Sequence, residues 1–298
     1  MRANPTATSE ILLDMDPGID DAVALMMALK SGVRVFGVTT VAGNVEVEKT
    51  SSNARRILQF MGRGEIPVGR GMDRPLVRQL RTCPEIHGED GLGNCGLPEP
   101  STGVNHFLEI WRQLPTGSIA VCTGPLTNAA VALLSIPDLH LRLKELIVMG
   151  GVLGLTEWAK GNVTPDAEFN FYTDPEAAHI VLHSGVPLTL VPLDTTLHPS
   201  LKITKSLGNP LSPAAELTER LVKYQLKKLG ETHLHDVTAL SYLLAPQLFE
   251  VRTYSISIDL GERRGKVLVH PGGVRVQVPL LVNGQALMDL VKSTLGFV

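Results

Sequence analysis

Short apolar segments alternate along this chain with longer segments whose apolar positions recur at helical spacing. Buried strands are predicted by the apolar runs at 11–13, 33–41, 118–122, 146–149 and 186–193. Helices are predicted by the patterns at 20–31, 45–61, about 125–134, from Asp174 onward, and near 212–229 and 237–244. Strands that are apolar throughout and alternate with helices are typical of a parallel sheet covered on both faces.

The segment 250–280 follows a different pattern. Its apolar and polar residues alternate more, and it contains turn signals such as Pro271-Gly272-Gly273, so it predicts hairpin strands added to the sheet. A closing helix is predicted near 284–295, and no repeat or Pro/Ser-rich linker divides the chain. We therefore expect a single Rossmann-like α/β domain over residues 1–298, with a mostly parallel open sheet, helices on both faces and extra C-terminal strands.

Composition and charge narrow the possible functions. The 298 residues are 44% hydrophobic and 19% charged, which excludes a disordered chain and allows a large core. The 27 basic and 30 acidic residues give a net charge of −3. No basic surplus is available to hold a phosphate backbone, and 2 Trp, 4 Tyr and 7 Phe are too few for a base-stacking platform. We therefore expect no nucleic-acid partner.

The cysteines and the first residues bear on location. Cys83, Cys95 and Cys122 form neither a disulfide framework nor a paired metal motif, and an odd, low count fits a reducing compartment. The start of the chain carries no apolar signal segment, and no run of about 18 apolar residues is present to span a membrane. The sequence thus predicts a cytoplasmic protein without a membrane partner.

Four aspartates stand within residues 14–21, directly after the first predicted strand. Carboxylates packed this closely repel one another, so a cation or protonation must neutralise some of them, and carboxylate oxygens select Ca²⁺ or Mg²⁺. The Pro17-Gly18 turn lets Asp16 and Asp21 point back at one ion. The simpler alternative, in which Asp20 only caps the next helix, explains one aspartate but not the two before the turn.

A strand followed by Asp-x-Asp fits two reaction classes. One is phosphoryl transfer through an aspartyl nucleophile, Asp14 or Asp16, and the other is attack by a metal-assisted water. The Pro17-Gly18 turn argues against the first class, because no Thr or Val occupies the usual slot after the pair. In open α/β sheets the ligand lies beyond the carboxyl ends of the strands, so further candidates are sought at 39–44, 123–128, 149–170 and 194–198.

The segment 14–25, DMDPGIDDAVAL, resembles the signature of the nucleoside hydrolases, the calcium-dependent N-ribohydrolases of the inosine–uridine type. Further segments resemble this family in the same order: Thr39–Asn44, Ile86–Glu89, Thr123–Asn128, Met149–Gly151, Ala167–Asn170, Asp174–Ala178 and His235-Asp236. One departure is Val237, where the family usually has proline. The resemblance covers nearly the whole chain and implies hydrolysis of ribonucleosides to ribose and a free nucleobase, in a homodimer or homotetramer.

The resemblance also implies a Ca²⁺ cofactor, bound by the carboxylates of Asp16, Asp21 and Asp236 and by the backbone carbonyl of Thr123. A water and two ribose hydroxyls would complete the site. Asp16 is our hypothesised general base, because it can touch both the ion and the water. Negative charge beside a sugar that becomes positive would stabilise the transition state.

Around the ribose, the resemblance implies contacts from Asp20, Asn44, Asn162, Glu168 and Asn170, with Met149 beneath the sugar. His87 would lie in a mobile active-site loop near the base. His235 would protonate the departing base, since an imidazole pKa lies near neutrality. The expected catalytic residues are therefore Asp16, Asn44 and His235. Glu168 and Asn170 are two apart, so on an extended segment they would face the same way.

Several alternatives stay open at this level. The rival functions are a DxD-type phosphatase acting on small phosphorylated metabolites and a non-catalytic nucleoside- or ribose-binding protein. Purine or pyrimidine preference is undecided, with Tyr224, Trp158 and His233 as candidates for the base pocket. Loops near 80–95, 155–160 and 223–235 would supply that pocket. Asp174 is expected to cap a helix, and Asp194 is given no role beyond support of the metal site.

Overall fold

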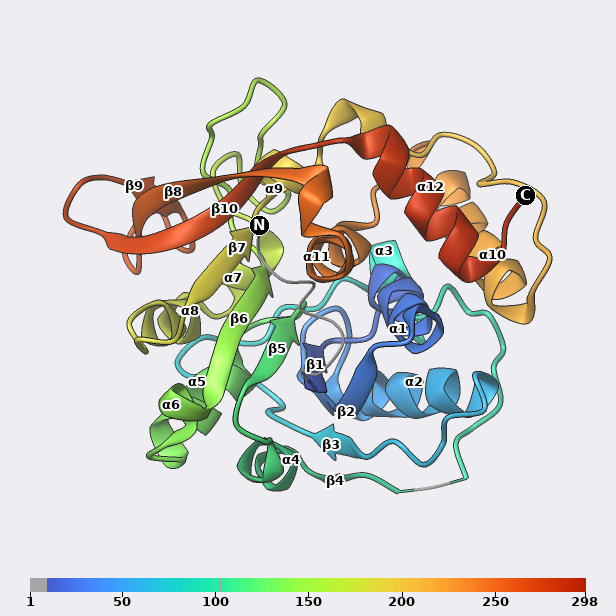
Figure 1. The fold of residues 1–298 in the computed structure, drawn as a ribbon, viewed down its shortest axis with the longest axis horizontal. Coiled ribbons are helices and arrows are strands. Elements are labelled where there is room, and N and C mark those ends of the chain that lie inside the picture. Colours follow the sequence, from blue (N-terminus) through green and yellow to red (C-terminus); the bar gives the residue numbers. More distant parts are fainter. Residues whose placement is uncertain (1–9, 102) are drawn as a thin grey trace.

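The first predicted strand lies near the middle of a ten-stranded sheet in the computed structural model, which describes residues 10–101 and 103–298 (Figure 1). The strands are β1 (Glu10–Met15), β2 (Arg34–Thr40), β3 (Val68–Arg70), β4 (Asn105–His106), β5 (Ser118–Cys122), β6 (Leu143–Met149), β7 (Leu188–Val191), β8 (Phe249–Ile258), β9 (Val267–Val269) and β10 (Val274–Val282). Their order across the sheet is β4-β3-β2-β1-β5-β6-β7-β10-β8-β9.

The strand directions confirm the predicted mostly parallel sheet. Strands β1 to β7 pair in parallel, and β10 adds to β7 in parallel. Strand β8 is antiparallel to β10, and β9 is antiparallel to β8, so the expected C-terminal hairpin strands are present. In Figure 1, β8 and β10 form the long orange and red pair.

The strand order reverses between β1 and β5, which lie side by side although seven helices and strands separate them in the chain. In an open parallel sheet, such a reversal opens a crevice beyond the carboxyl ends of the two strands. Asp14 at the end of β1 is level with Cys122 at the end of β5. The segments that follow, starting at Asp16 and Thr123, therefore meet at this crevice.

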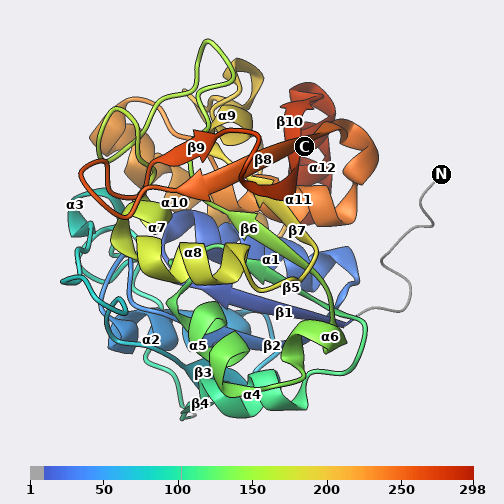
Figure 2. The ribbon, with the colours of Figure 1, turned by 90° about the vertical axis from the view of Figure 1, so that its left-hand side faces the viewer.

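Alternation along β1 explains why helices cover both faces of the sheet. Ile11, Leu13 and Met15 contribute to a core on one face, and Leu12 contributes to a second core on the other. The first core packs under α1 (Ile19–Ser31), α2 (Val47–Phe60), α10 (Pro213–Leu229), α11 (His235–Leu244) and α12 (Gly284–Leu295). The second packs under α4 (Phe107–Gln113), α5 (Thr127–Ser135) and α8 (Pro175–Leu182). Figure 2 shows α5 and α8 next to each other.

Four further short helices complete the chain: α3 (Pro84–His87), α6 (Leu139–Arg142), α7 (Phe169–Thr173) and α9 (Leu193–Thr196). Single 3-10 turns occur at Pro199–Leu201 and Pro246–Leu248. The sequence pattern predicted none of these short elements. It also placed the start of α5 near Pro125, whereas the helix begins at Thr127.

The helix caps test two of the predictions. Asp174 is the N-cap of α8, and its carboxylate accepts from the Ala177 N–H at 3.0 Å, as predicted. The N-cap of α1 is Gly18, so the alternative that Asp20 caps this helix is wrong. Its neighbour Asp21 instead accepts from the Gly18 N–H at 3.1 Å.

Within residues 10–101 and 103–298, no helix is both long and apolar enough to cross a bilayer. The three cysteines are free thiols. The first nine residues, on which part of the location prediction rests, lie outside the described residues. That one domain spans residues 1–298 stays a prediction.

Candidate active site

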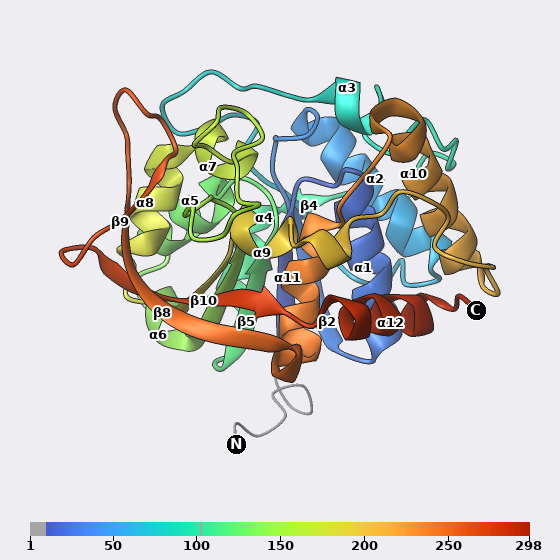
Figure 3. The same cartoon turned by 90° about the horizontal axis from the view of Figure 1, so that it is seen from above.

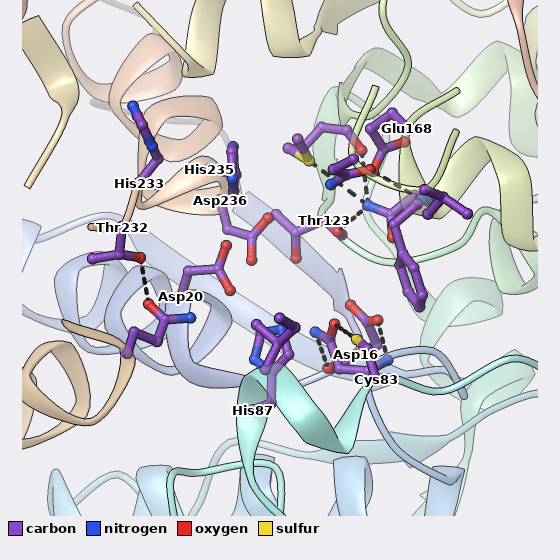
Figure 4. A pocket seen from close by; sticks show the side chains of 18 of the residues that line it. Asp16, Asp20, Cys83, His87, Thr123, Glu168, Thr232, His233, His235 and Asp236 are labelled. Atoms are coloured by element: carbon purple, nitrogen blue, oxygen red, sulfur yellow. Dashed lines mark hydrogen bonds between the residues drawn. The ribbon is translucent and has the colours of Figure 1, made fainter. Parts of the chain in front are cut away.

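A cavity of about 510 Å³ lies at the crevice between β1 and β5 (Figure 4). The segments that follow β1, β2, β5 and β6 line its floor, and α3, the end of α10 and the start of α11 line its walls. Of the predicted site residues, the lining includes Asp16, Asp20, Asn44, His87, Thr123, Met149, Asn162, Glu168, Asn170, His235 and Asp236. Residues more than 200 positions apart therefore meet in one pocket.

An acidic cluster forms the centre of the floor. Asp20, Asp21 and Asp236 each place a carboxylate oxygen within 4.8 Å of the others, and all three are buried. The first two belong to the first turn of α1, and Asp236 belongs to the first turn of α11, so two helix N-termini meet here. Helix N-termini carry partial positive charge, which favours acids at these positions.

Burial and mutual repulsion dominate the electrostatics of this cluster. Burial raises the pKa of Asp20 to about 7, and the charge of Asp21 adds to the rise. Burial also raises the pKa of Asp236 well above its usual value, with a further rise from Asp20. None of the ion pairs among the described residues involves these acids, so no Lys or Arg neutralises them.

These residues fit a hard divalent cation. Such an ion prefers several oxygen ligands, and a buried group of carboxylates without a basic partner provides them. The fit of the donor set supports a metal site in general and does not select one metal. The grouping differs from the predicted one in one respect: Asp20 joins Asp21 and Asp236, whereas Asp16 lies beside the group in the same cavity.

Asp16 is held by the loop that follows β2. Its carboxylate accepts from the backbone N–H of Asn44 at 2.8 Å, and the Asn44 amide donates to the Asp16 carbonyl at 3.0 Å. The same amide donates to Asp21 at 3.1 Å. Burial, and then the charge of Asp21, raise the pKa of Asp16 well above its usual value. Asn44 therefore donates hydrogen bonds to both Asp16 and Asp21, the two residues after β1 that are predicted to bind the cation.

Thr123, at the end of β5, connects the acidic cluster to the ribose side of the pocket. Its hydroxyl donates to Asp21 at 2.8 Å. Its backbone carbonyl, the predicted metal ligand, accepts from the Asn170 amide at 2.7 Å. The Asn170 amide also donates to the carbonyl of Met149 at 3.2 Å. These bonds hold Thr123, Met149 and Asn170 together, and their contact with a ribose stays a prediction.

Glu168 and Asn170 are not on an extended segment, which corrects the sequence analysis. Glu168 is the N-cap of α7, and its carboxylate accepts from the N–H groups of Asn170 at 2.8 Å and Phe171 at 3.1 Å. A third bond comes from the Gly151 N–H at 2.8 Å. Both side chains still line the cavity, because a cap residue and the first turn share one end of the helix.

Burial lowers the pKa of the wall histidines and so favours their neutral form. Burial lowers the pKa of His235 to about 3, with smaller effects from His233 and His87. This differs from the near-neutral value that the sequence analysis assumed, because the imidazole is enclosed by protein. His235 Nδ1 lies 2.7 Å from the Thr196 hydroxyl, and its ring is stacked on His233 with 5.9 Å between centroids.

His87 ends the short helix α3 and is 6% exposed. Its Nδ1 accepts from the Ile19 N–H at 3.0 Å, so the ring is attached to the start of α1. Burial lowers its pKa to about 4. The predicted mobility of this region stays a prediction.

Of the three residues predicted for the base pocket, Tyr224, Trp158 and His233, one lines the cavity. His233 lines it, and its Nε2 has no hydrogen-bond partner. Tyr224 and Trp158 are not among the lining residues: Tyr224 packs against Gly93, and Trp158 donates to the Asp194 carbonyl at 2.7 Å.

Sequence reasoning missed Gln225, which lines the cavity and accepts from the Thr232 hydroxyl at 2.6 Å. It lies on α10, inside the helix predicted near 212–229 and inside the 223–235 range named for the base pocket, but it was not named as a candidate. The only sequence feature that indicates a role for Gln225 in the pocket is that it is a polar residue near the end of a long predicted helix.

Comparisons with known proteins show the family of this chain. The family described as "Inosine-uridine preferring nucleoside hydrolase" matches residues 11–289. A pyrimidine-specific ribonucleoside hydrolase, RihA, from Citrobacter koseri is 40% identical over 255 residues, which are 80% of this chain and 80% of that protein.

Two solved structures are similar along almost their whole length. A plant nucleoside hydrolase, PpNRh1, has a TM-score of 0.87 and 28% identity, with 96% of this chain and 98% of that chain covered. A purine-preferring ribonucleoside hydrolase from Gardnerella vaginalis has a TM-score of 0.84 at 24% identity, with the same coverage, and supports the fold alone.

The fold and the acidic pocket thus define an α/β protein with its candidate site at the strand-order reversal. The chain belongs to the inosine-uridine preferring nucleoside hydrolase family, and it is a nucleoside N-ribohydrolase. The family resemblance found in the sequence is therefore confirmed. This assignment takes the place of the phosphatase and of the non-catalytic binding protein.

Proposed function

We propose that the chain hydrolyses pyrimidine ribonucleosides with Ca²⁺ as its cofactor, Asp16 as general base and His235 as proton donor to the leaving base. The observation that carries the proposal is that the buried carboxylates of Asp16, Asp20 and Asp236 and the half-buried imidazole of His235 line one cavity. The pyrimidine preference is supported by the 40% identical relative named as pyrimidine-specific.

The cation would be held by Asp16, Asp21, Asp236 and the Thr123 carbonyl, with Asp20 close enough to contribute. When bound, it supplies positive charge that makes a water easier to deprotonate and holds ribose hydroxyls in place. It also favours the ionised form of Asp16, whose pKa burial raises in the free protein.

The chain's own residues supply the remaining chemistry. Asp16 removes a proton from the attacking water, and Asn44 fixes its carboxylate through the backbone bond of 2.8 Å. Cleavage of the C–N bond makes the ribosyl group positive, and the clustered carboxylates favour this charge. Asn170 and Glu168 complete the ribose wall.

The leaving base departs with negative charge unless it gains a proton. His235 is neutral in the free protein because burial lowers its pKa. Negative charge that develops on the base beside it favours the protonated imidazole: the ring takes up a proton from solvent water, gives it to the base nitrogen and returns to its neutral form. His235 directly precedes Asp236 in the chain, and both residues line the cavity, which supports this role.

The principal test is chromatography of uridine, cytidine, inosine and guanosine after incubation with the purified chain. We expect uracil and cytosine with ribose, inosine and guanosine cleaved at least roughly tenfold more slowly, loss of all cleavage in chelator, and recovery with CaCl₂. Cleavage that persists in chelator contradicts the metal role, and a faster purine reaction contradicts the pyrimidine preference.

Two variants separate the residue roles. Asp16→Asn should lower kcat by about 10²-fold or more, and Asp73→Asn, its exposed matched control, should leave kcat unchanged.

His235→Ala should strongly slow the cleavage of uridine and barely affect that of p-nitrophenyl riboside, whose leaving group needs no proton. Equal losses on the two substrates contradict the proton-donor role.

A further inference from the structure

The short helix α9 (Leu193–Thr196) is completely buried and lies behind the pocket, outside the lining residues. Figure 3 shows it beside the loop that follows β6 and above α11. It belongs to the strand-end segment that sequence analysis singled out but gave no function. Leu193 and Asp194 form hydrogen bonds with the loop, and Thr196 forms one with α11.

The first contact holds the loop after β6. The Asp194 carboxylate accepts from the N–H groups of Leu153 at 2.8 Å and Leu155 at 2.6 Å. The Asp194 carbonyl accepts from the Trp158 indole at 2.7 Å, and the Leu193 N–H donates to the Gly151 carbonyl at 2.9 Å. The carboxylate is fully buried and directed at the loop, and its support of the metal site stays a prediction.

This loop continues into the pocket. Lys160 and Asn162, which follow it directly, line the cavity. Loop residues between Gly151 and Trp158 have no regular secondary structure, so they depend on such contacts for a fixed position. A buried carboxylate that accepts two N–H groups supplies stronger, charge-assisted bonds.

The second contact holds the proton donor. Thr196 is fully buried, and its hydroxyl lies 2.7 Å from His235 Nδ1. A hydrogen bond to one ring nitrogen fixes the orientation of the ring and leaves the other nitrogen to face the substrate. Thr196 is the one hydrogen-bond partner of the His235 ring that the described residues provide.

We propose that α9 is a positioning element for catalysis: Thr196 orients His235, and Asp194 fixes the loop that carries Lys160 and Asn162. The part on Thr196 rests on the proposed function of His235. Neither residue lines the cavity, so both act through other residues. The neighbouring Thr195 provides a matched control, since it is equally buried and its hydroxyl donates to the Pro279 carbonyl of β10 at 2.8 Å, away from the pocket.

The first experiment compares uridine with p-nitrophenyl riboside. Thr196→Val should lower kcat/KM for uridine by about tenfold or more and change that for p-nitrophenyl riboside by less than about twofold. Thr196→Ser should restore uridine cleavage, because it keeps the hydroxyl. Thr195→Val loses an equivalent hydrogen bond and should leave the ratio of the two rates unchanged.

The outcomes are distinguishable. If His235→Ala is selective for uridine and Thr196→Val is not, the positioning role of Thr196 is overturned while the proposed function stands. If His235→Ala affects both substrates equally, the proton-donor role falls and the part on Thr196 falls with it. If Thr195→Val reproduces the selective loss, the effect belongs to general packing and the positioning role is overturned.

The second experiment tests Asp194 without reference to His235. Asp194→Asn removes one of the two acceptors, so it should raise KM by about tenfold for both substrates with a smaller change in kcat. Trp158 is one of 2 tryptophans, and the other, Trp111, is fully buried. Acrylamide quenching of the variant should therefore rise through Trp158. Unchanged KM together with increased quenching overturns the positioning of the loop.

Discussion

At the scale of single residues, burial sets the charge state of almost every group in the pocket. Desolvation raises the pKa of Asp14 to about 7 and of Asp20 to about 7, and it lowers the pKa of His87 to about 4. Both directions have one cause, because a low-dielectric surrounding disfavours the charged form of any group. The free site therefore holds neutral imidazoles and partly protonated acids.

His87 gives a prediction with a defined sign. Its pKa falls from 6.5 to about 4 on folding, so between these values the unfolded state binds a proton that the folded state does not. The free energy of unfolding therefore decreases as pH falls from 6.5 to 4, by at most about 3 kcal/mol from this group, and has no such contribution above pH 6.5.

Urea unfolding of the natural chain and of His87→Gln at pH 7.5 and pH 4.5 measures this contribution. The glutamine does not titrate, so the variant should lose less free energy of unfolding on acidification than the natural chain. Parallel losses in the two proteins contradict the assignment of a buried neutral His87.

At the scale of elements, the site depends on loops that approach one another closely after the strands end. A Cβ at Gly18 would lie 2.4 Å from His87 Nδ1 and 2.6 Å from the Asn44 amide nitrogen. Real Cβ atoms do not approach so closely, so the turn between β1 and α1, the loop after β2 and α3 fit together only with glycine here. The close approach at Gly18 includes the side chain of Asn44, whose backbone N–H donates to the Asp16 carboxylate.

We predict that Gly18→Ala displaces His87 or Asn44 and lowers kcat/KM for ribonucleosides by about tenfold or more, since small shifts of catalytic groups are costly. Gly64→Ala is the control, because its Cβ would meet only the Gln59 side chain at 3.7 Å. Steady-state kinetics and circular dichroism of both variants check the prediction. A fully active Gly18→Ala protein would show that the close packing is dispensable.

At the scale of the whole molecule, the acidic cluster joins the N-termini of α1 and α11, which lie at opposite ends of the sequence. Without a cation, folding brings buried carboxyl groups together at a cost in free energy. A cation that binds only the folded arrangement therefore stabilises the entire chain.

We predict that CaCl₂ at about 100 times its dissociation constant raises the free energy of unfolding by about 2.7 kcal/mol, which thermal denaturation can follow. Protons compete for the same carboxylates, whose pKa values are raised, so at one fixed CaCl₂ concentration the increment should be larger at pH 8 than at pH 5.5.

In chelator, Asp236→Asn should stabilise the chain rather than destabilise it. It removes one of three mutually repelling carboxylates, so the metal-free variant should melt at a higher temperature than the metal-free natural chain. It should also lose the Ca²⁺-dependent increment, whereas Asp73→Asn should retain it. A variant that keeps the full increment contradicts the role of Asp236 as a ligand.

The sequence alone determined the alternation of strands and helices, the C-terminal hairpin strands and the acidic segment after β1. These features are local: apolar runs, caps such as Asp174, and charge density are readable from neighbouring residues. The family signature added the ordered set of site residues, since it combines many such local segments.

Only the tertiary structure decided which groups share the pocket and in which charge state. It placed Asp20 beside Asp236, made Glu168 a cap, brought Gln225 from a long helix to the cavity, and set His235 beside Thr196. The physical reason is that desolvation and hydrogen bonding depend on residues distant in the chain. A local pattern specifies which groups are present, and the packed fold sets their neighbours and hence their chemistry.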